Sequence, residues 1–392
     1  MHLHLHLTEW VVSVGAIISL LYYLAVLFSA WRYFRRPFHR DPDFSPPVSI
    51  LKPVRGLDRE AYANFASFCN LDYPEYEILF GVADADDPVI PVIQKLVEDY
   101  PHRSIRLLVG SSCKGWNSKV RKLCRLSREA RYRILVISDS DIRVQPDYLR
   151  AVVNPFRNPK VGAVTCMYHM QPESRLGSEI EAVGLTSDFL AGVIVARQLE
   201  GVKFGLGATI AVTAERLKDI GGFEAIADCF SDDFELGRRI ADKGHDVELI
   251  PYTVATLSPS QGALDAVKHQ LRWAVGVRHS RPWGQLGRLL TQALPWVVAA
   301  TLVQHTWEGT AGFLGAYLAL RLAVAWTVGV WGLKDPLLKK RLWLVPAWDA
   351  LAFFILAVSF SKRRIEWRGS EFYVRKGRLR PATSAFLDRE GS

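Results

Sequence analysis

The sequence has few cysteines, and none of them is spaced for a metal or redox site. Its five cysteines form no C-x-x-C pair and no His/Cys cluster with zinc spacing, which excludes zinc fingers and thioredoxin-like motifs. We therefore expect all five to be reduced thiols of a cytosolic domain. The chain also has no internal repeat and no low-complexity tract, so a repeat architecture is excluded.

Basic residues outnumber acidic ones. The 392 residues include 49 Lys and Arg against 40 Asp and Glu, a formal charge of +9, and 49 % are hydrophobic. A positive balance indicates acidic partners, which are anionic lipid headgroups, phosphates or nucleic acid. Because the basic residues crowd beside hydrophobic segments, we expect lipid and phosphate partners and no nucleic acid. The length fits a soluble domain plus a membrane part.

Hydrophobic runs near both ends predict a membrane protein. An N-terminal anchor over 1–40 contains an uncharged span at 10–31, long enough to cross a bilayer. The arginines after this span should be cytosolic, which places the amino terminus outside. A second membrane region over 284–361 contains runs at 286–304, 311–333 and 342–360. The last run has basic residues on both sides, so we expect it to re-enter the membrane; an ordinary span is the alternative. A basic cytosolic tail over 362–392 follows.

Between these regions, residues 47–283 read as an α/β domain. Short apolar strands alternate with helical stretches, which is typical of a parallel, Rossmann-like sheet. The expected strands are Val48–Leu51, Ile78–Val82, Ile105–Val109, Ile134–Ile137 and Val161–Cys166. The expected helices are Arg59–Phe68, Pro88–Glu98, Lys119–Ala130, Glu179–Arg197, Ala214–Ile220 and Ser231–Lys243, with a glycine-containing strand or turn over Phe204–Val212 and Ser231 as an N-cap.

Two aspartates follow the buried strand Ile134–Ile137 directly. Asp139 and Asp141 at a strand's carboxyl end can hold Mg²⁺ or Mn²⁺ that also binds a diphosphate. A phosphatase nucleophile is a second interpretation, but that pattern has Thr or Val where Arg143 stands. A solvated turn is the third interpretation.

Other acids add to this pair. Asp84 follows the strand Ile78–Val82 and should lie beside Asp139 to bind a base or ribose; the alternative is a turn residue. Asp233 lies at a helix start, where an acid also stabilises the helix dipole.

The stretch HQLRWAVGVRHSRP precedes the second membrane region. Arg272 suits a phosphate and Trp273 suits a sugar or a lipid neck, whereas Arg278 and Arg281 read as a basic juxtamembrane anchor.

Taken together, these motifs resemble the D, D, D, Q/R-x-x-R-W pattern of the ceramide glucosyltransferase family. Further segments look like family landmarks: SFCNLDYPEYEILFGVADADDP, GWNSKVRKL, FGLGATIAV, GGFEAIAD and IEWRGSEFYVRKG. The resemblance implies an inverting enzyme with a GT-A fold that uses a UDP-sugar. HQLRW, FGLGAT and the WRG tail look closer to a bacterial branch that adds N-acetylglucosamine to hopanoids. His269 departs from the family's Gln or Arg, which puts the role of that position in doubt.

The resemblance also implies roles for single residues. Asp233 would be the general base, Asp232 would raise its pKa, and Arg272 would stabilise the departing diphosphate. Donor contacts would come from Asp84, Asn117, Lys119, Asp139, Asp141 and Arg272, with Asp139 also counted as catalytic and Asp139 and Asp141 as metal ligands. Acceptor contacts would come from Gly207, Thr209, His269 and Trp273.

The expected protein is therefore an integral membrane hexosyltransferase of glycolipid synthesis, with its catalytic domain on the cytosolic side of a bacterial inner membrane. It would move glucose or N-acetylglucosamine from a UDP-sugar to a lipid hydroxyl, with ceramide (a sphingolipid) or a hopanoid as acceptor. A processive polysaccharide synthase shares the same site logic but needs a longer membrane channel. A non-catalytic nucleotide- or lipid-binding membrane protein is the alternative from another class.

Overall fold

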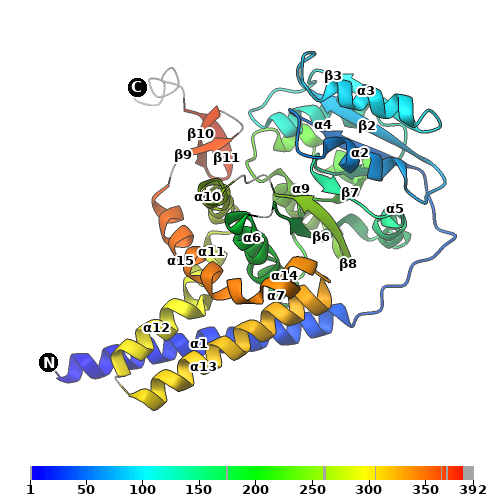
Figure 1. Ribbon diagram of the computed structural model, residues 1–392. Coiled ribbons are helices and arrows are strands. Elements are labelled where there is room, and N and C mark those ends of the chain that lie inside the picture. Colours follow the sequence, from blue (N-terminus) through cyan, green and yellow to red (C-terminus); the bar gives the residue numbers. More distant parts are fainter. Residues whose placement is uncertain are drawn as a thin grey trace. The chain divides into compact units, whose positions relative to one another are not determined.

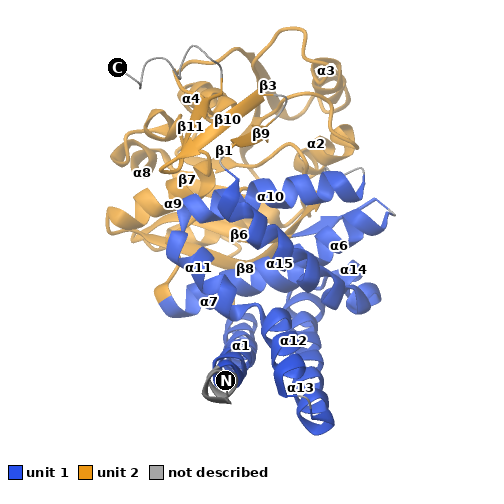
Figure 2. Ribbon diagram, turned by 90° about the vertical axis from the view of Figure 1, so that its left-hand side faces the viewer, with its two compact units in different colours: residues 1–36, 169–199, 260–363 blue, residues 37–168, 200–259, 364–392 orange. Residues whose placement is uncertain are grey.

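The computed structural model describes residues 2–173, 175–258, 262–304, 306–362, 364–367 and 370–382. The chain divides into two compact units (Figure 2). The helical unit comprises residues 1–36, 169–199 and 260–363, and the sheet unit comprises 37–168, 200–259 and 364–392. Residues 169–199, which the sequence places within the α/β stretch, thus cluster with the helices.

The sheet unit is built on a mixed, eight-stranded sheet in the order β3-β2-β1-β4-β7-β6-β8-β5 (Figure 1). Its strands are β1 (Val48–Pro53), β2 (Tyr76–Val82), β3 (Ser104–Val109), β4 (Ile134–Ile137), β5 (Ile142–Arg143), β6 (Val161–Gln171), β7 (Ile210–Thr213) and β8 (Asp246–Leu257). The first four strands in this order pair in parallel, whereas β7 pairs antiparallel with β4 and β6. The predicted parallel-dominated α/β fold is confirmed.

Helices connect the parallel strands, as the alternating pattern predicts. They are α2 (Ala61–Cys69), α3 (Ile90–Asp99) and α4 (Ser118–Glu129), and later come α5 (Tyr148–Val153), η1 (Asn154–Arg157), α8 (Ala214–Asp219), η3 (Phe223–Ile226) and α9 (Asp232–Asp242). The strands β1, β2 and β4 are buried along their whole length and are largely apolar, although β1 contains Ser49 and Lys52 and β2 contains Glu77. Leu51, Leu79 and Leu135 of these strands share one core cluster with Leu123 of α4. Since the three strands are parallel, their carboxyl ends meet at one edge of the sheet.

Some elements were not predicted. The strands β5 and β8 were missed, and the basic tail contains a three-stranded antiparallel sheet of β9 (Arg364–Trp367), β10 (Ser370–Arg375) and β11 (Arg378–Pro381). Within Phe204–Val212 only the end is a strand. The expected helix Glu179–Arg197 is α6 (Leu176–Gly184), a π-helical turn η2 (Leu185–Phe189) and α7 (Leu190–Glu200). Tail residues 363, 368, 369 and 383–392, including two of the three residues in the WRG motif, lie outside the described residues.

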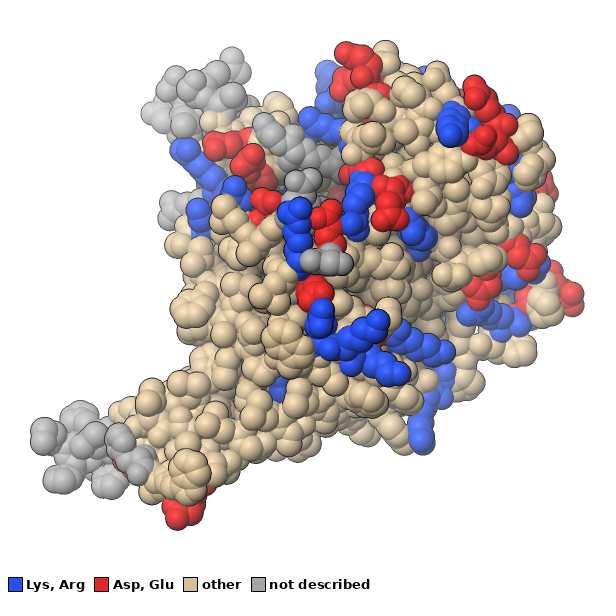
Figure 3. All heavy atoms as spheres, viewed as in Figure 1, with Lys and Arg blue, Asp and Glu red and all other residues tan. Residues whose placement is uncertain are grey.

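Long apolar helices make up most of the helical unit. Besides α6, η2 and α7, they are α1 (His2–Phe34), α10 (Ala263–Ser280), α11 (Pro282–Thr291), α12 (Ala293–Gln304), α13 (Trp307–Ala325), η4 (Trp326–Gly332), α14 (Pro336–Arg341), η5 (Leu342–Leu344) and α15 (Val345–Ser361). By length and composition, four helical stretches in the described part of the chain are able to cross a membrane: Thr8–Phe34, Pro282–Gln304, Trp307–Gly332 and Pro336–Ser361. In Figure 3 the face of α1, α12 and α13 is nearly free of charge. The re-entry of 342–360 stays a prediction.

The charges inside two of these apolar helices form one buried ion pair. Arg321 of α13 is 3 % exposed, and its Nε lies 2.8 Å from Oδ2 of Asp349 on α15. Tyr317 donates a hydrogen bond to the same carboxylate at 2.8 Å, and Arg321 also donates to the backbone oxygen of Ser187. Charges in a membrane segment face a partner inside the bundle rather than the lipid. The pair therefore ties α13 to α15.

The expectation that all five cysteines are reduced is wrong for two of them. Cys113 and Cys124 form a disulfide, whereas Cys69, Cys166 and Cys229 are free and buried. Cys113 lies in the loop before α4 and Cys124 lies on that helix, so the loop folds back onto the helix that follows it. Spacing along the chain did not indicate this pair, because the two cysteines are separated by 11 positions that include a turn and the start of α4.

Candidate functional site

The turn after β4 is held in place by a buried lysine on β1. Lys52 is fully buried, and its Nζ donates to the backbone oxygen of Asp139 at 2.9 Å and to Oγ of Ser138 at 3.3 Å. The amine also lies 3.7 Å from the ring centre of Phe68. Burial lowers the pKa of Lys52 to about 7, although the charges of Asp141 and Asp139 oppose this shift. The side chain of Lys52 on β1 thus fixes the backbone of the D-x-D turn, which is Asp139 to Asp141.

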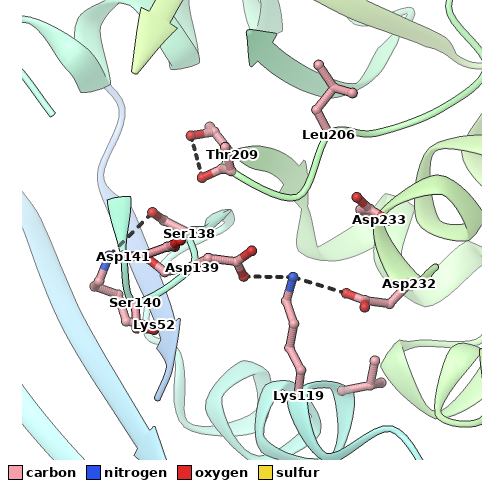
Figure 4. A network of polar contacts seen from close by, with 12 residues as sticks. Lys52, Lys119, Ser138, Asp139, Ser140, Asp141, Leu206, Thr209, Asp232 and Asp233 are labelled. Atoms are coloured by element: carbon pink, nitrogen blue, oxygen red, sulfur yellow. Dashed lines mark hydrogen bonds and ion pairs between the residues drawn. The ribbon is translucent and has the colours of Figure 1, made fainter. Parts of the chain in front are cut away.

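Lys119 joins two of the predicted acids. Its Nζ lies 2.7 Å from Oδ1 of Asp139 and 3.3 Å from Oδ2 of Asp232, and Figure 4 shows the amine between the two carboxylates. Burial alone would lower the pKa of Lys119, but Asp139, Asp232 and Asp233 outweigh it and raise that pKa. The lysine is therefore a fixed positive charge in the middle of the acids. It reaches this place from the first turn of α4, which begins at Ser118.

Asn117 anchors the start of α4 and the segment before α9 at once. As the N-cap, its Oδ1 accepts from the backbone N–H groups of Lys119 and Val120. Its Nδ2 donates to the backbone oxygen of Cys229 at 2.8 Å and to Oδ1 of Asp232 at 3.2 Å. Both ends of the side-chain amide are thus engaged within the protein. This geometry favours a positioning role for Asn117 over a direct contact with a ligand.

Asp233 stands on the first turn of α9 and faces a glycine. A Cβ placed on Gly207 would come within 3.1 Å of Oδ2 of Asp233 and within 3.4 Å of Oδ2 of Asp139. The loop before β7 therefore passes close to both carboxylates, and any side chain at position 207 would intrude on them. On the other side of this loop, a Cβ on Gly237 would come within 2.3 Å of the backbone of Phe204. The two glycines allow the loop and α9 to approach closely.

The electrostatics of Asp233 suit a proton acceptor. Burial and then the charge of Asp232 raise the pKa of Asp233, Lys119 opposes them, and the result is a pKa of about 6. A carboxyl with such a pKa is ionised at neutral pH and still basic enough to take a proton. Asp141 is raised in the same way, to about 6, by burial and then by the charge of Asp139.

Asp141, in the turn between β4 and β5, and Tyr168, on β6, complete the cluster. Oδ2 of Asp141 accepts from Oγ1 of Thr256 on β8 at 2.8 Å. Tyr168 is 7 % exposed at the end of β6. Burial raises the pKa of its hydroxyl, and the charges of Asp233, Asp139 and Asp141 raise it further. The hydroxyl of Tyr168 is thus within electrostatic reach of all three acids.

Two predicted residues of the sheet unit remain, which are Asp84 and Thr209. Asp84 is exposed after β2, at the sheet edge where Asp139 follows β4. Thr209 is fully buried, and its hydroxyl shares a hydrogen bond of 2.9 Å with the hydroxyl of Tyr148. Thr209 therefore supports the loop that carries Gly207.

His269, Arg272 and Trp273 lie on α10, in the helical unit. Nδ1 of His269 lies 2.5 Å from Oε1 of Glu181, a carboxylate that is 1 % exposed on α6. The ring of Trp273 packs at 5.0 Å from His269 and at 5.8 Å from Phe189. His269 thus has a buried acidic partner, which gives this departure from the family pattern a structural reason. The structure thus forms two groups of predicted residues. His269 and Trp273 pack together in the helical unit, and Asp139, Lys119 and Asp232 join in the sheet unit.

The acidic cluster fits a divalent cation. No group of three His, Cys, Asp or Glu side chains in the described part of the chain is arranged to hold a metal by itself. Mg²⁺, however, commonly takes one or two carboxylates and completes its shell with phosphate oxygens and water. Asp139 and Asp141 supply two such groups, and their mutual repulsion raises the pKa of Asp141. A cation would relieve that repulsion.

Sequence reasoning missed Lys52 and Tyr168. Lys52 interrupts the apolar strand SILKP, and a charged residue within a buried strand is a usable signal because it needs a partner. Tyr168 carried no comparable signal, since tyrosine is common in strands.

Comparison with known proteins supplies the family. A profile of glycosyl transferase family 21 matches residues 11–380. The chain belongs to glycosyl transferase family 21. The match spans both units and almost the whole described chain.

Named relatives agree with this family. Ceramide glucosyltransferase 1 of Caenorhabditis elegans is 24 % identical over 258 residues, which cover 65 % of this chain and 55 % of the relative. Ceramide glucosyltransferase of Komagataella phaffii is 32 % identical over 141 residues, covering 33 % of this chain and 28 % of the relative. The chain thus spans about half of the nematode family 21 protein.

A solved structure shares the fold. The mannosyltransferase PcManGT from Pyrobaculum calidifontis, in complex with GDP-Man and Mn²⁺, superposes with a TM-score of 0.57 at 20 % identity. The superposition covers 90 % of this chain and 98 % of that one. The GT-A fold implied by the sequence is therefore confirmed for this family 21 chain.

Proposed function

We propose that this protein is a membrane-bound glycosyltransferase that moves a hexose from a UDP-sugar to a lipid hydroxyl with inversion. The observation that carries the proposal is the group of Asp139, Lys119, Asp232 and Asp233, which places a raised-pKa carboxylate beside a D-x-D turn. Membership of family 21 and the ceramide glucosyltransferase relatives support it. Ceramide is the first candidate acceptor, and a hopanoid receiving N-acetylglucosamine is the second.

In the proposed reaction, Asp233 removes the proton from the lipid hydroxyl. That oxygen forms a bond to the anomeric carbon while the bond from this carbon to the UDP oxygen breaks, so the electron pair leaves with UDP. General-base assistance of this kind is worth about 10²- to 10⁴-fold in rate. Lys119 keeps Asp233 ionised by opposing the effects of burial and of Asp232. One displacement inverts the configuration.

A divalent cation would be held by Asp139 and Asp141 and would neutralise the diphosphate. The Mn²⁺ in the fold neighbour supports this assignment. We assign Asn117 to positioning, Asp84 to the nucleoside, and Arg272 to the departing diphosphate. Gly207 leaves room between the acids for the sugar, Thr209 supports its loop, and Trp273 with His269 serves the acceptor.

The apolar helices support a role for the bilayer. A water-insoluble acceptor needs an enzyme at the membrane, and four described helical stretches are long and apolar enough to cross one. We place the catalytic domain on the cytosolic side of a bacterial inner membrane, because the basic flank after α1 follows the positive-inside rule.

The proposal is tested by UDP release from the purified full-length chain in detergent or nanodiscs. UDP-glucose and UDP-N-acetylglucosamine are each supplied with no lipid, with ceramide, or with a hydroxylated hopanoid. Mass spectrometry of the extracted lipids then identifies any glycolipid product. We expect UDP release that depends on one of the lipids and a glycolipid of matching mass. A polymer formed without lipid would favour a polysaccharide synthase. Donor binding without any transfer would favour a non-catalytic binder.

A further inference from the structure

The tail sheet β9–β11 is bonded directly to the segment that leads into α9. The backbone N–H of Leu379 donates to the oxygen of Asp228 at 2.8 Å, and the N–H of Phe230 donates to the oxygen of Gly377 at 2.9 Å. Between them, Cys229 and Arg378 form an antiparallel bridge. Residues 228–230 thus act as a short additional strand on β11, which is the edge strand of the tail sheet. Two residues later α9 begins with Asp232.

A ring contact reinforces these backbone bonds. Phe230 and Trp367 of β9 meet edge to face, with ring centres 5.9 Å apart and an angle of 88° between the planes. Aromatic pairs in this arrangement contribute beyond their buried area. The contact fixes the side chain of Phe230, whose backbone already pairs with the tail.

The opposite side of the same segment is held by the loop before α4. Asn117 donates from its backbone to Ala227 and from its side chain to the oxygen of Cys229. The backbone N–H of Trp116 donates to Oδ1 of Asp228 at 3.0 Å. The segment is therefore clamped between the tail sheet and the loop that carries Lys119 into the acid cluster.

The start of α9 lacks the usual local device that fixes a helix terminus. Ser231 occupies the N-cap position, as predicted, but its side chain makes no capping hydrogen bond. A capping serine normally fixes the first turn of its helix. In its absence, the first turn is held by contacts from outside the helix. Lys119 and Asn117 bind Asp232, and the N–H of Gly205 donates to the oxygen of Asp233. The clamped residues 228–230 lead directly into this turn and therefore also bear on its position.

We propose that the C-terminal sheet is a positioning element of the active site, which holds the first turn of α9 so that Asp232 and Asp233 face Lys119 and Gly207. This inference rests on the proposed function for its kinetic consequence, but its structural consequence does not depend on the reaction. Trp367 contacts the segment through its side chain. Leu379 acts through its N–H, which faces Asp228 rather than β10.

Two tail variants test the proposal, with a matched control. Trp367→Ala removes the ring contact, and Trp367→Phe restores an aromatic edge. Leu379→Pro removes the N–H that donates to the backbone oxygen of Asp228. The control is Tyr373→Ala, because Tyr373 of β10 stacks on Arg364 within the tail sheet itself. All are measured as full-length protein in nanodiscs.

The first readout is hydrogen–deuterium exchange of peptides that span residues 226–237. We expect faster exchange there in Trp367→Ala and Leu379→Pro, with wild-type exchange in Trp367→Phe and Tyr373→Ala. Unchanged exchange in both test variants would overturn the proposal. Equally faster exchange of residues 226–237 in Tyr373→Ala would overturn it too, since any destabilisation of the tail sheet would then have the same effect as loss of the specific contacts. This readout needs no substrate, so it decides the inference even if no transfer is found for the wild-type chain.

The second readout is the split between kcat and donor KM. Displacing a general base by about 1 Å is expected to lower kcat by roughly 10- to 100-fold while the donor KM stays near the wild-type value. The acidic limb of the kcat profile should also move toward lower pH, because a loosened first turn exposes Asp233 to water. A fall in the amount of folded protein with an unchanged kcat per folded molecule would contradict the positioning role.

Discussion

The Nζ of Lys119 lies 2.7 Å from Oδ1 of Asp139 and 3.3 Å from Oδ2 of Asp232, so one lysine joins the D-x-D turn to the first turn of α9. These two acids come from segments almost 100 residues apart in the sequence. The lysine offsets the charge of both and also lowers the pKa of the neighbouring Asp233. The charge balance of the whole site therefore depends on this side chain.

Opposite pH shifts are expected from the two neighbours of Asp233. As a general base Asp233 acts ionised, so kcat should fall as the pH drops below its pKa of about 6. Lys119→Met removes a positive charge, which raises the pKa of Asp233 and moves the acidic limb to higher pH. Asp232→Asn removes a negative charge, which lowers that pKa and moves the limb to lower pH. The pH dependence of kcat measures both, and shifts of the same sign would refute the assignment of Asp233.

Gly207 is expected to tolerate no side chain without loss of activity. In Gly207→Ala the methyl group would lie 3.1 Å from Oδ2 of Asp233 and 3.4 Å from Oδ2 of Asp139. We expect transfer to fall by about 10-fold or more, since small displacements of reacting groups are costly. Gly287→Ala on α11 is the control, because a Cβ there meets nothing within 4 Å. The measurement is the steady-state transfer rate of both variants. Equal rates would show that the reaction does not need the space beside Gly207.

Metal removal should abolish donor binding as well as transfer. Asp139 and Asp141 alone give a cation too few protein ligands, so the cation and the diphosphate are expected to bind together. Calorimetry of UDP binding with Mn²⁺, and again with EDTA, measures this coupling without turnover. Asp141→Asn should reduce the increase in UDP affinity that Mn²⁺ causes, whereas Asp242→Asn at the far end of α9 should leave that increase unchanged. Full UDP affinity in EDTA would remove the metal from the account.

The buried pair of Arg321 and Asp349 should be costly to break on one side. Asp349→Ala leaves the guanidinium of Arg321 buried without its carboxylate, and such losses cost about 3–5 kcal/mol. Replacing both partners, as in Arg321→Met with Asp349→Leu, should recover much of this stability. The exposed pair of Arg216 and Asp219 is the control, for which Asp219→Ala should change little. Thermal unfolding in detergent compares the four proteins. An unaffected Asp349→Ala protein would mean that the pair does not stabilise the bundle.

The sequence predicted the parts of the fold that depend on local patterns. Buried parallel strands are continuous apolar runs, so the strand Ile134–Ile137 was found to the residue, and with it the place of Asp139. The acids at the start of α9 were located differently, from Ser231 as the N-cap of the predicted helix.

What depends on contacts distant in sequence was not predictable. The strands of the tail are short and rich in charge, so β9–β11 read as a basic tail, and their pairing with residues 228–230 leaves no local pattern. The role of Lys52 follows from a neighbour, the backbone oxygen of Asp139, that no spacing reveals. The resemblance implied a donor contact for Asn117, and the hydrogen bonds that its amide makes within the protein leave no pattern in the sequence.

The measurement that tests the central claim most directly is transfer and donor binding on the same preparation of Asp233→Asn. The substitution keeps the size of the side chain and removes the proton acceptor. We expect UDP-sugar affinity close to that of the wild type and a transfer rate lower by about 10²- to 10⁴-fold. Loss of binding in step with transfer, or a transfer rate near that of the wild type, would contradict the account of Asp233 as the base in this acidic cluster.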